Sequence, residues 1–554
     1  METTLTRRTS VPQVGSRFAP PAPGEITSTT SPSSRYLRDT RTGVIASRPA
    51  VLRESRDEIR MAWRRSAALA LDIIQNSGRL RGACDQVIAD TVGAELTLNP
   101  HPDPIVMKAL GYSEVEVAEF VRLIKQRWKR WAWNPAECDQ RGKFTVPQMV
   151  DIGLRWFIAF GEVTGTITYM TRAQRRTYGI SSGAKVCMVP PSRLVQDTNE
   201  LENLFQGVRH DANGRPIAYR FAERLDGVDR KRDWPARDRA GRPIVMHLFD
   251  PVDATDVRGI SVLASAFRKH IQHEMLDDVT LQTAVLQTVF AAVLTSSLPS
   301  AEAFEALEQL QEDANGRQIA TDLIGLLGAQ IDKARDSSIS IGSDPVVSHL
   351  APGEDLRLQA AQTPGSQYLP FSKSLSRDMA RAIGISYGGL TMDYEGATYS
   401  STRMENSSIW PVVTRRRERI AGPQCQMIYE NWLDEEIGEG RIPFRGGYEA
   451  FAANRDAISW AQWRGPAKPT ADDHKSARAG TERLQNRTSS LDVETAELGH
   501  DPEEIREQQY REHLWYVERG MASPYDRSPS AGAKAPSADE PDEDERKRSG
   551  GDRS

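Results

Sequence analysis

Apolar side chains recur at steps of three or four residues along much of the chain, and this spacing predicts amphipathic helices. Outside the middle of the chain, the helical stretches cover, in order, residues 55–77, 114–133, 371–383, 400–436 and about 470–520. Gly384 is expected to end the third stretch, and Pro411 and Pro423 are expected to break the fourth. Helices are therefore predicted on both sides of the central part of the chain.

Residues 150–250 show a different pattern, in which β-branched and aromatic residues are grouped between glycines and prolines, and this pattern favours strands. The predicted strands cover residues 156–169, 185–195, 215–221 and about 241–249. The segment Asp211-Ala-Asn-Gly214 has the composition of a tight turn, because these residue types accept the backbone angles that turns need. A β-rich region within a helical chain indicates the α+β class.

The longest helix is predicted between Ser261, which we expect to cap it, and about residue 297. This stretch of about 35 residues has no internal glycine or proline and would be about 50 Å long at 1.5 Å per residue. Its apolar positions are Leu263, Phe267, Ile271, Met275, Val279, Leu286, Phe290 and Val293. Pro299 is expected to end it, followed by a shorter acidic helix at residues 302–312 and by strand and loop at 336–356.

The length of 554 residues exceeds what one hydrophobic core usually supports, so several packed regions are expected. Both ends lack apolar periodicity, which predicts a disordered or extended arm over residues 1–45 and a disordered tail over residues 521–554. Between them, the predicted regions are an α+β region at 46–260 that is β-rich at 150–250, the long helix at 261–298, a mixed region at 299–400 and a helical region at 401–520.

The formal net charge is -5, which argues against a protein that binds duplex DNA tightly, because such proteins neutralise phosphates with a basic excess. It is compatible with a protein past which DNA slides without being held. The sequence contains no run of about 18 apolar residues and no apolar secretory signal, so we expect no membrane span and no secretion. The four cysteines lie far apart, which favours reduced thiols in a cytosolic protein.

The sequence contains no clear catalytic or metal-binding constellation. Residues 179–185 lack the spacing of a phosphate-binding loop. Gly384-Ile-Ser-Tyr-Gly388 matches the pattern around a hydrolase nucleophile, but that chemistry needs a preceding strand, and a helix is predicted there. We interpret this segment as a helix stop with a tight turn. His270 and His273 have no further ligands nearby in sequence, which favours solvated or interface positions over a metal site.

Two basic stretches, residues 125–130 and 415–419, carry charges that could contact phosphate. A solvated or salt-bridged surface is the favoured interpretation of both, and the tryptophans in and after the first stretch are expected to pack rather than to stack on bases. No catalytic, cofactor-binding or metal-binding residue is therefore assigned.

Several segments resemble, in the same order, motifs of the lambda-type family of tailed-phage portal proteins. They are Gly-Glu at 161–162, VPPSRL at 189–194, GVRHDANGRPIAY at 207–219, HLFDPVDATDVRGISVL at 247–263, GISYGGLTMDYEGATYSSTR at 384–403, Trp-Leu at 432–433 and the segment 463–480. The fourth departs from the family pattern at Asp253 and at Thr255-Asp256, where arginine and glutamine are typical. The resemblance spans roughly residues 35–515 and leaves out the N-terminal arm and the acidic tail.

The resemblance implies a non-enzymatic, cofactor-free protein that forms a ring, usually of twelve copies, at one capsid vertex, through which double-stranded DNA is packaged and ejected. It implies a multi-domain α+β portal fold with a β-rich wing, a stem of long helices, a clip and a helical C-terminal crown. The implied partners are further copies of the chain, DNA passing non-specifically, the large terminase subunit, the major capsid protein, scaffold and head-completion proteins. The implied location is the virion, and the host cytoplasm during assembly.

Within that family, the long helix suits a channel wall whose apolar stripe packs against neighbouring copies. The polar residues expected to face the channel or head proteins are Arg268, Lys269, Glu274, Asp277 and Asp278. A wall of mixed or negative charge would repel phosphate and lower the friction on passing DNA. The residues expected at structural turns and subunit contacts are Gly259, Gly384, Tyr394, Tyr399 and Arg403. The alternatives are a head-associated hydrolase or protease, and a non-portal head or scaffold protein.

Overall fold

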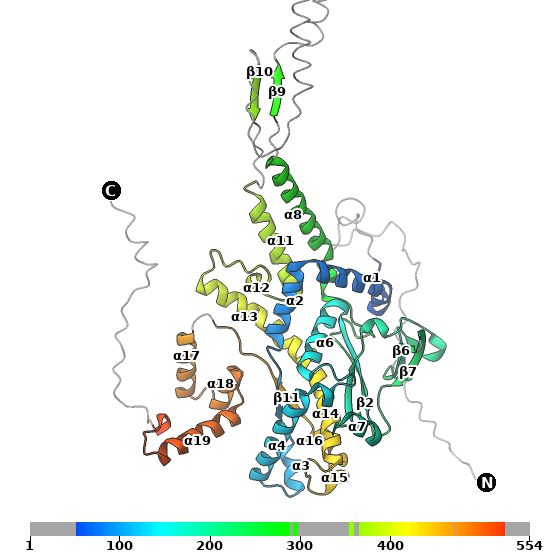
Figure 1. Ribbon diagram of the computed structural model, residues 1–554, viewed down its shortest axis with the longest axis vertical. Coiled ribbons are helices and arrows are strands. Elements are labelled where there is room, and N and C mark those ends of the chain that lie inside the picture. The colour runs from blue at the N-terminus through cyan, green and yellow to red at the C-terminus, as the bar shows by residue number, and fades with distance from the viewer. Residues whose placement is uncertain are drawn as a thin grey trace, which may run out of the picture. The chain divides into compact units, whose positions relative to one another are not determined.

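The computed structural model describes residues 51–225, 227–288, 292–296, 354–358, 365–470 and 473–526 (Figure 1). The chain divides into two compact units. The first comprises Met1–Val262, Gly384–Ser386 and Tyr394–Ser554, and the second comprises Leu263–Ile383 and Tyr387–Asp393. The predicted N-terminal arm, the helix at 302–312, the strand and loop at 336–353 and the tail beyond residue 526 lie outside the described residues.

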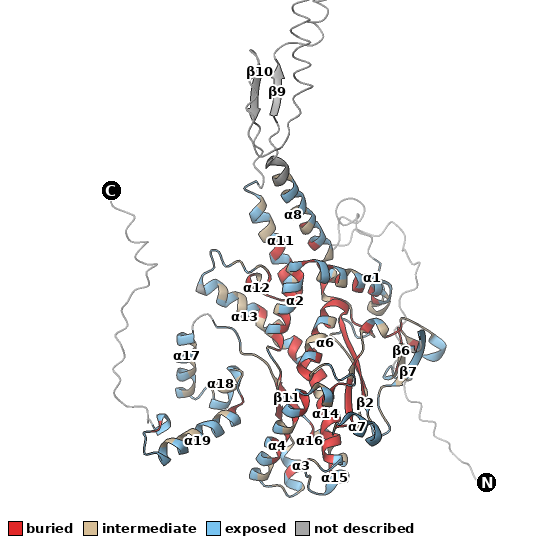
Figure 2. Cartoon of the chain, viewed as in Figure 1, coloured by how far each residue is buried: buried red, intermediate tan, exposed pale blue. Residues whose placement is uncertain are grey.

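The core of the first unit is built on helices α4 (Glu114–Ala132), α6 (Val146–Phe160) and α14 (Gly422–Gly438). Helix α4 confirms the predicted helix at 114–133, and it begins with a capping box in which Ser113 and Glu116 exchange hydrogen bonds. Five aromatic rings pack together in this core, namely Trp128, Trp131, Tyr429, Trp432 and Trp463. Figure 2 shows the buried residues concentrated along α6, α14 and the neighbouring strand β2.

Two helices precede this core, α1 (Ser55–Asn76) and α2 (Gly78–Thr91). Ser77 separates them and accepts a hydrogen bond from the backbone N–H of Leu80, which caps the start of α2. The predicted helix at 55–77 is thereby confirmed. The short helices of this unit are α3 (Pro104–Ala109), α5 (Pro135–Cys138), α7 (Arg172–Tyr178), α15 (Gly447–Ala453) and α16 (Arg455–Ile458).

The β-rich part of the first unit contains two antiparallel sheets. In the first, β2 (Glu162–Tyr169) lies between β3 (Ala184–Met188) and β8 (Val245–Phe249). The second has the order β4 (Leu204–Phe205), β5 (Val208–His210), β6 (Pro216–Leu225) and β7 (Val228–Pro235). A further pair joins β1 (Thr97–Pro100) to β11 (Ala461–Arg464). The α+β class is therefore confirmed.

Each of the four predicted strands began or ended at the wrong place, and the strands at 215–221 and 241–249 are observed as β6 (Pro216–Leu225) and β8 (Val245–Phe249). Residues 156–160 form the last turn of α6, and Gly161 ends that helix in the left-handed region at φ 86°. These five residues are all apolar, so this last turn by itself shows no periodicity that would distinguish it from a strand. The predicted strand at 185–195 ends at Met188, because the prolines that follow begin a short 3-10 turn at Pro191–Arg193.

Pro411 does not break the chain as expected, since α13 (Tyr399–Arg416) runs through it. The irregularity lies further on, in a π-helical turn at Arg417–Ala421 that leads into α14. This turn lets the buried Arg417 side chain donate from Nε to the carbonyl oxygen of Thr91, 2.8 Å away at the end of α2. Pro423 is the second residue of α14, directly after this π-helical turn, and the helical path continues through it.

Three helices follow near the C-terminus, as predicted for residues 470–520: α17 (Asp473–Gln485), α18 (Leu491–Glu497) and α19 (Pro502–Glu518). Among them only Pro502 is buried, so they contribute almost nothing to a core. Lys125 on α4 attaches them to the rest of the unit by an ion pair of 2.6 Å with Asp501, the N-cap of α19. Residues 524–526, assigned from the sequence to the disordered tail, form a short 3-10 turn.

The second unit contains α8 (Phe267–Thr288), β9 (Ala292–Ser296), β10 (Glu354–Leu358), α11 (Tyr368–Ile383) and α12 (Tyr387–Thr391). The prediction of one helix over 261–297 was wrong at both ends. The helix begins at Phe267 rather than after Ser261, because a 3-10 turn at Val262–Ser265 comes first, and the Ser261 hydroxyl donates to the carbonyl oxygen of Ile158. Beyond Thr288 the chain forms β9, which pairs antiparallel with β10, a partner too distant in sequence for local periodicity to reveal.

Candidate functional site

Helices α8 and α11 form an antiparallel pair in the second unit, held by polar contacts between side chains. From the start of α8, these contacts join Lys269 to Asp378, His270 Nδ1 to Met379 Sδ (3.4 Å), His273 Nε2 to Ser372 Oγ (2.8 Å) and the Tyr368 hydroxyl to Asp277 Oδ1 (2.6 Å). The first two positions on α8 contact the end of α11 and the last one contacts its start, so the two helices run in opposite directions. This pair contains all five residues predicted to face a channel.

The buried face of α8 is polar. His270 and His273 are both buried, and each has a carboxylate one turn later, Glu274 at 3.1 Å and Asp277 at 3.5 Å. The sequence predicted solvated or interface histidines, and this prediction was wrong because both rings are buried within the subunit, where they contact α11. Among the described residues, no three or more His, Cys, Asp or Glu side chains are placed to hold a metal ion.

The outward face of α8 is largely apolar. Ile271, Met275 and Val279 are 38%, 62% and 57% exposed, and their spacing of four places them on one face of the helix. At about 100° per residue, Arg268 and Asp278 share this face, whereas Lys269, Glu274 and Asp277 lie nearer the histidines. The five predicted channel residues therefore do not share one polar face. Arg268, Lys269 and Asp278 are exposed, and Glu274 and Asp277 are partly buried.

In the first unit, Glu162 and Arg258 form a fully buried ion pair. The guanidinium Nε lies 2.9 and 2.8 Å from the two carboxylate oxygens, and His247 Nε2 lies 3.0 Å from Oε2. Burial alone would raise the pKa of Glu162, but the charge of Arg258 and the hydrogen bonds from His247 and Arg258 lower it to about 2. The carboxylate is therefore ionised in the interior of the protein.

Arg258 also holds the loop around residues 191–206, since its guanidinium donates to the carbonyl oxygens of Pro191, Leu194 and Gln206. On its other side it lies over the ring of Trp63 on α1, 4.6 Å from the ring centroid. One arginine therefore connects α1, β2 and this loop. No role for Glu162 or Arg258 was predicted from the sequence, although each belongs to a motif that carries the family resemblance. No local pattern links residues 96 positions apart.

Gly259, predicted to lie at a turn or subunit contact, is explained by a close approach within the chain. A Cβ atom at this position would lie 2.0 Å from the carbonyl oxygen of Gly161. The backbone N–H of Gly259 donates to Glu162 at 3.3 Å. Any side chain here would therefore push the Glu162–Arg258 pair apart.

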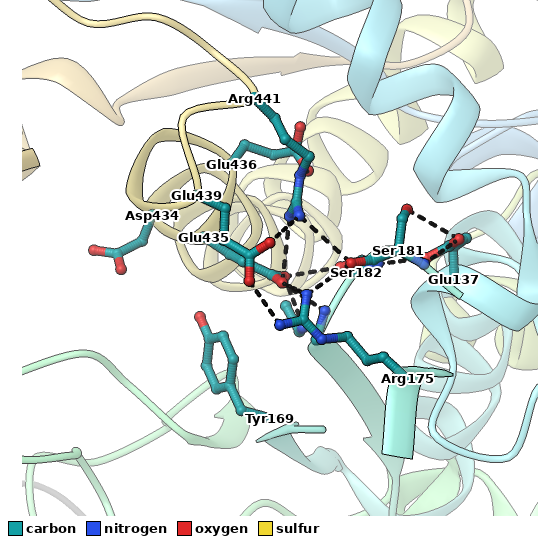
Figure 3. A network of polar contacts seen from close by, with 12 residues as sticks. Glu137, Tyr169, Arg175, Ser181, Ser182, Asp434, Glu435, Glu436, Glu439 and Arg441 are labelled. Carbon is teal, nitrogen blue, oxygen red and sulfur yellow. Dashed lines mark hydrogen bonds and ion pairs between the residues drawn. The ribbon is translucent and has the colours of Figure 1, made fainter. Parts of the chain in front are cut away.

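A second buried carboxylate, Glu435 on α14, fixes the loop that precedes β3 (Figure 3). It accepts hydrogen bonds from Ser182 Oγ at 2.8 Å and from the backbone N–H groups of Gly183 and Ala184 at 2.5 and 2.7 Å. Arg175 and Arg441 balance its charge from 3.5 and 3.3 Å. Both carboxylate oxygens of Glu435 accept hydrogen bonds from the segment 182–184, so the network holds this loop against α14.

The remaining predicted positions lie around α11 to α13. Gly384 follows α11 in the left-handed region at φ 78°, which confirms the helix stop. Its segment 384–388 connects one helix to another without the strand that a nucleophile elbow requires. Tyr394 and Arg403 are exposed, and Tyr399 is the first residue of α13.

Both basic stretches are salt-bridged, as the sequence predicted. Arg127 pairs with Glu436 at 2.6 Å. Arg415 and Arg419 both reach Asp250, at 2.7 and 2.9 Å. Within the described residues no helix is both long enough and apolar enough to cross a bilayer.

Comparison with known proteins identifies a family to which the chain is similar. Residues 42–417 match the family described as phage portal protein, lambda family. The chain is 27% identical over 472 residues to portal protein B of Escherichia phage lambda, covering 83% of this chain and 85% of that protein. It is 26% identical over 474 residues to the portal protein of Escherichia phage N15, covering 83% and 86%.

Among solved structures, the chain resembles the neck of a native gene transfer agent particle computed with C12 symmetry, with 13% identity and a TM-score of 0.32. That similarity covers 72% of this chain and 98% of the other, and it is too low to bear on assembly. The family match confirms the resemblance drawn from the motifs, and it makes the chain a structural protein rather than an enzyme. Since the match covers more than half of its length, this chain belongs to the lambda family of phage portal proteins.

Proposed function

We propose that this chain is one subunit of a closed ring of twelve copies at a capsid vertex, through which double-stranded DNA is packaged and ejected. The observation that carries the proposal is the outward apolar stripe of α8, formed by Ile271, Met275 and Val279. The isolated subunit buries the histidines of α8 and exposes these three apolar side chains, so covering them with another protein surface would stabilise the structure.

In the proposed ring, α11 of a neighbouring copy packs on the α8 stripe. Helix α11 exposes Leu369 and Phe371, which are 62% and 55% accessible. Burying an aliphatic or aromatic side chain of this size contributes about 1.5–3 kcal/mol. In a cyclic ring each subunit offers two different faces, one to each neighbour. The α8 stripe of one copy and the two α11 residues of the next form such a pair of faces.

The charges on α8 suit a wall that DNA passes without being held. Lys269, Glu274 and Asp277 have partners within the α8–α11 pair, so part of their charge is neutralised there. Arg268 and Asp278 are exposed and form no ion pair or side-chain hydrogen bond with any residue that the structure describes. Both lie on the same face of α8 as the apolar stripe, and opposite charges in equal number give phosphate little net attraction where this face borders the bore.

In the same proposal, the region at 46–260 is the wing, the helix within 261–298 is the stem, residues 299–400 include the clip, and residues 401–520 form the crown-like helical region. The partners would be the large terminase subunit during packaging and head-completion proteins afterwards, with scaffold and major capsid protein around the ring. The protein would act in the virion and would assemble in the host cytoplasm.

Negative-stain electron microscopy of the purified full chain tests the ring directly. We expect closed particles of cyclic symmetry with a central opening wide enough for a DNA duplex. Material that remains monomeric under every assembly condition, with scaffold protein added, would contradict the proposal.

A further inference from the structure

The first unit contains a cavity of about 460 Å³ whose wall is strongly basic. It lies where the β6–β7 hairpin meets the loop at residues 140–141 and the segment that follows β3 (β6 and β7 are labelled in Figure 1). Its charged lining consists of Arg141, Arg193, Arg224, Arg232 and a single acidic residue, Glu223. A net positive cavity is unexpected in a chain whose formal charge is -5.

Much of this positive charge is not neutralised within the subunit. Arg193 reaches Asp229 at 3.4 Å and Arg232 reaches Glu223 at 3.7 Å, and both pairs are open to solvent, where ion pairs contribute little. Arg141 and Arg224 are exposed and form no ion pair or side-chain hydrogen bond with the described residues. The cavity is therefore suited to an anionic ligand.

The aromatic residues of the wall do not favour a nucleotide. The guanidinium of Arg232 already covers the ring of Trp234 at 4.6 Å, and the indole N–H of Trp234 donates to Glu223 at 2.7 Å. Phe221 is buried. A base entering the cavity would therefore find no free ring on which to stack.

The arginines favour several separate carboxylates over one compact anion, because they project from the loop, from the turn after β3 and from both strands of the hairpin. Each guanidinium can take a carboxylate in a bidentate arrangement. Strand addition to β7 is disfavoured, because that edge strand carries Arg230, Lys231 and Pro235, residue types that block edge pairing. The arginines of the cavity would therefore recognise the carboxylate side chains of the ligand rather than its backbone.

We propose that this cavity binds a carboxylate-rich peptide segment, and that its occupant is the acidic run at residues 539–545 of this same chain. Six of the seven residues of that run are acidic, namely Asp539, Glu540, Asp542, Glu543, Asp544 and Glu545. A tethered segment whose linker spans the distance to its site has an effective concentration in the millimolar range, so that weak contacts with a few arginines are enough for occupancy. This inference does not depend on ring formation.

Cys187 is a built-in reporter of this occupancy. It lines the cavity and is the only one of the four cysteines that is not buried. The experiment measures the rate at which neutral iodoacetamide alkylates Cys187 in the full chain, followed by mass spectrometry of the peptide that contains it. A variant with the six acidic residues changed to Asn or Gln is expected to react about five-fold faster, as for a tethered ligand that occupies the site most of the time.

A synthetic peptide of residues 536–545 should restore protection to the tail-neutral variant, and its Asn/Gln counterpart should not. The double change Arg141→Gln and Arg224→Gln should abolish that protection, whereas Arg130→Gln, an exposed arginine of α4 outside the cavity, should leave it intact. Comparing rates with and without peptide for each variant removes any effect of the substitutions on the thiol itself. Equal alkylation of the parent and tail-neutral chains would overturn the proposal, as would stronger protection by a single-stranded oligonucleotide of equal charge.

Discussion

Arg258 and Glu162 form a fully buried ion pair that fixes the start of β2 to the segment following β8. Removing the carboxylate in Glu162→Ala leaves the guanidinium buried without its counter-charge, a change that typically costs about 3–5 kcal/mol. We therefore expect a strongly lowered melting temperature in thermal unfolding. Arg155→Ala, which breaks the solvent-exposed pair of Arg155 with Asp85, is the matched control and should cost less than about 1 kcal/mol. Equal destabilisation by the two changes would show that the buried ion pair contributes no more to the free energy of unfolding than an exposed one.

The same carboxylate should make stability depend on pH. The pKa of Glu162 falls from 4.5 to about 2 in the folded chain, because Arg258 and His247 outweigh the effect of burial. Since the folded value lies below the unfolded one, the stabilisation is complete above about pH 4.5 and is lost as the pH falls toward 2. At about 1.4 kcal/mol per pKa unit, it amounts to about 3 kcal/mol.

Thermal unfolding of the parent chain and of Glu162→Gln, compared between pH 6 and pH 3, isolates this contribution from that of the other carboxylates. The melting temperature of the parent should fall more steeply with acidification than that of the variant. Parallel curves would mean that Glu162 is not held ionised by its neighbours.

Lys125 holds the C-terminal helices through Asp501, which is nearly inaccessible to solvent although α17, α18 and α19 bury almost nothing else. Lys125→Met should raise the fraction of molecules in which these helices detach by about 10–100-fold, as expected for a lost charged hydrogen bond of about 1.5–3 kcal/mol. Limited proteolysis between residues 485 and 500 should accelerate accordingly.

Two further variants identify the cause of that detachment. Asp501→Asn keeps the N-cap of α19 but loses the charge, and it should behave like Lys125→Met. Lys129→Met removes an exposed lysine that lies 3.8 Å from Glu95, and its proteolysis should match that of the parent chain. Faster cleavage in the Lys129 variant would point to a general loosening of α4 instead.

The sequence predicted those parts of the fold that local patterns determine. Helix α4 was predictable because its apolar spacing follows a capping box at Ser113 and Glu116, and the stop at Gly384 because glycine accepts the left-handed angles there. Strand β9 was missed because it depends on a partner strand that begins at Glu354.

The candidate site was predicted less well than the fold, for two physical reasons. No sequence pattern indicated that Glu162 and Arg258 meet, because they lie 96 residues apart along the chain. On α8, the usual rule that apolar residues face inward would bury Met275 and expose His273, and the structure shows the reverse. The family, by contrast, was predictable, because the order of several motifs is a property of the sequence itself.

That reversal on α8 gives the test of the proposed subunit contact. Met275→Asp places a charge in the middle of the outward stripe, where covering it by a neighbouring copy would cost several kcal/mol because no partner charge is available. We expect sedimentation velocity to show monomers in place of rings, with unchanged thermal stability of the subunit, since the side chain is already exposed there. Met275→Leu should still assemble, because it conserves volume and apolarity. Lys269→Gln should also assemble, since Lys269 lies off the stripe, where it pairs with Asp378 of the same subunit. If Met275→Asp formed normal rings, this face of α8 would not be the contact between copies.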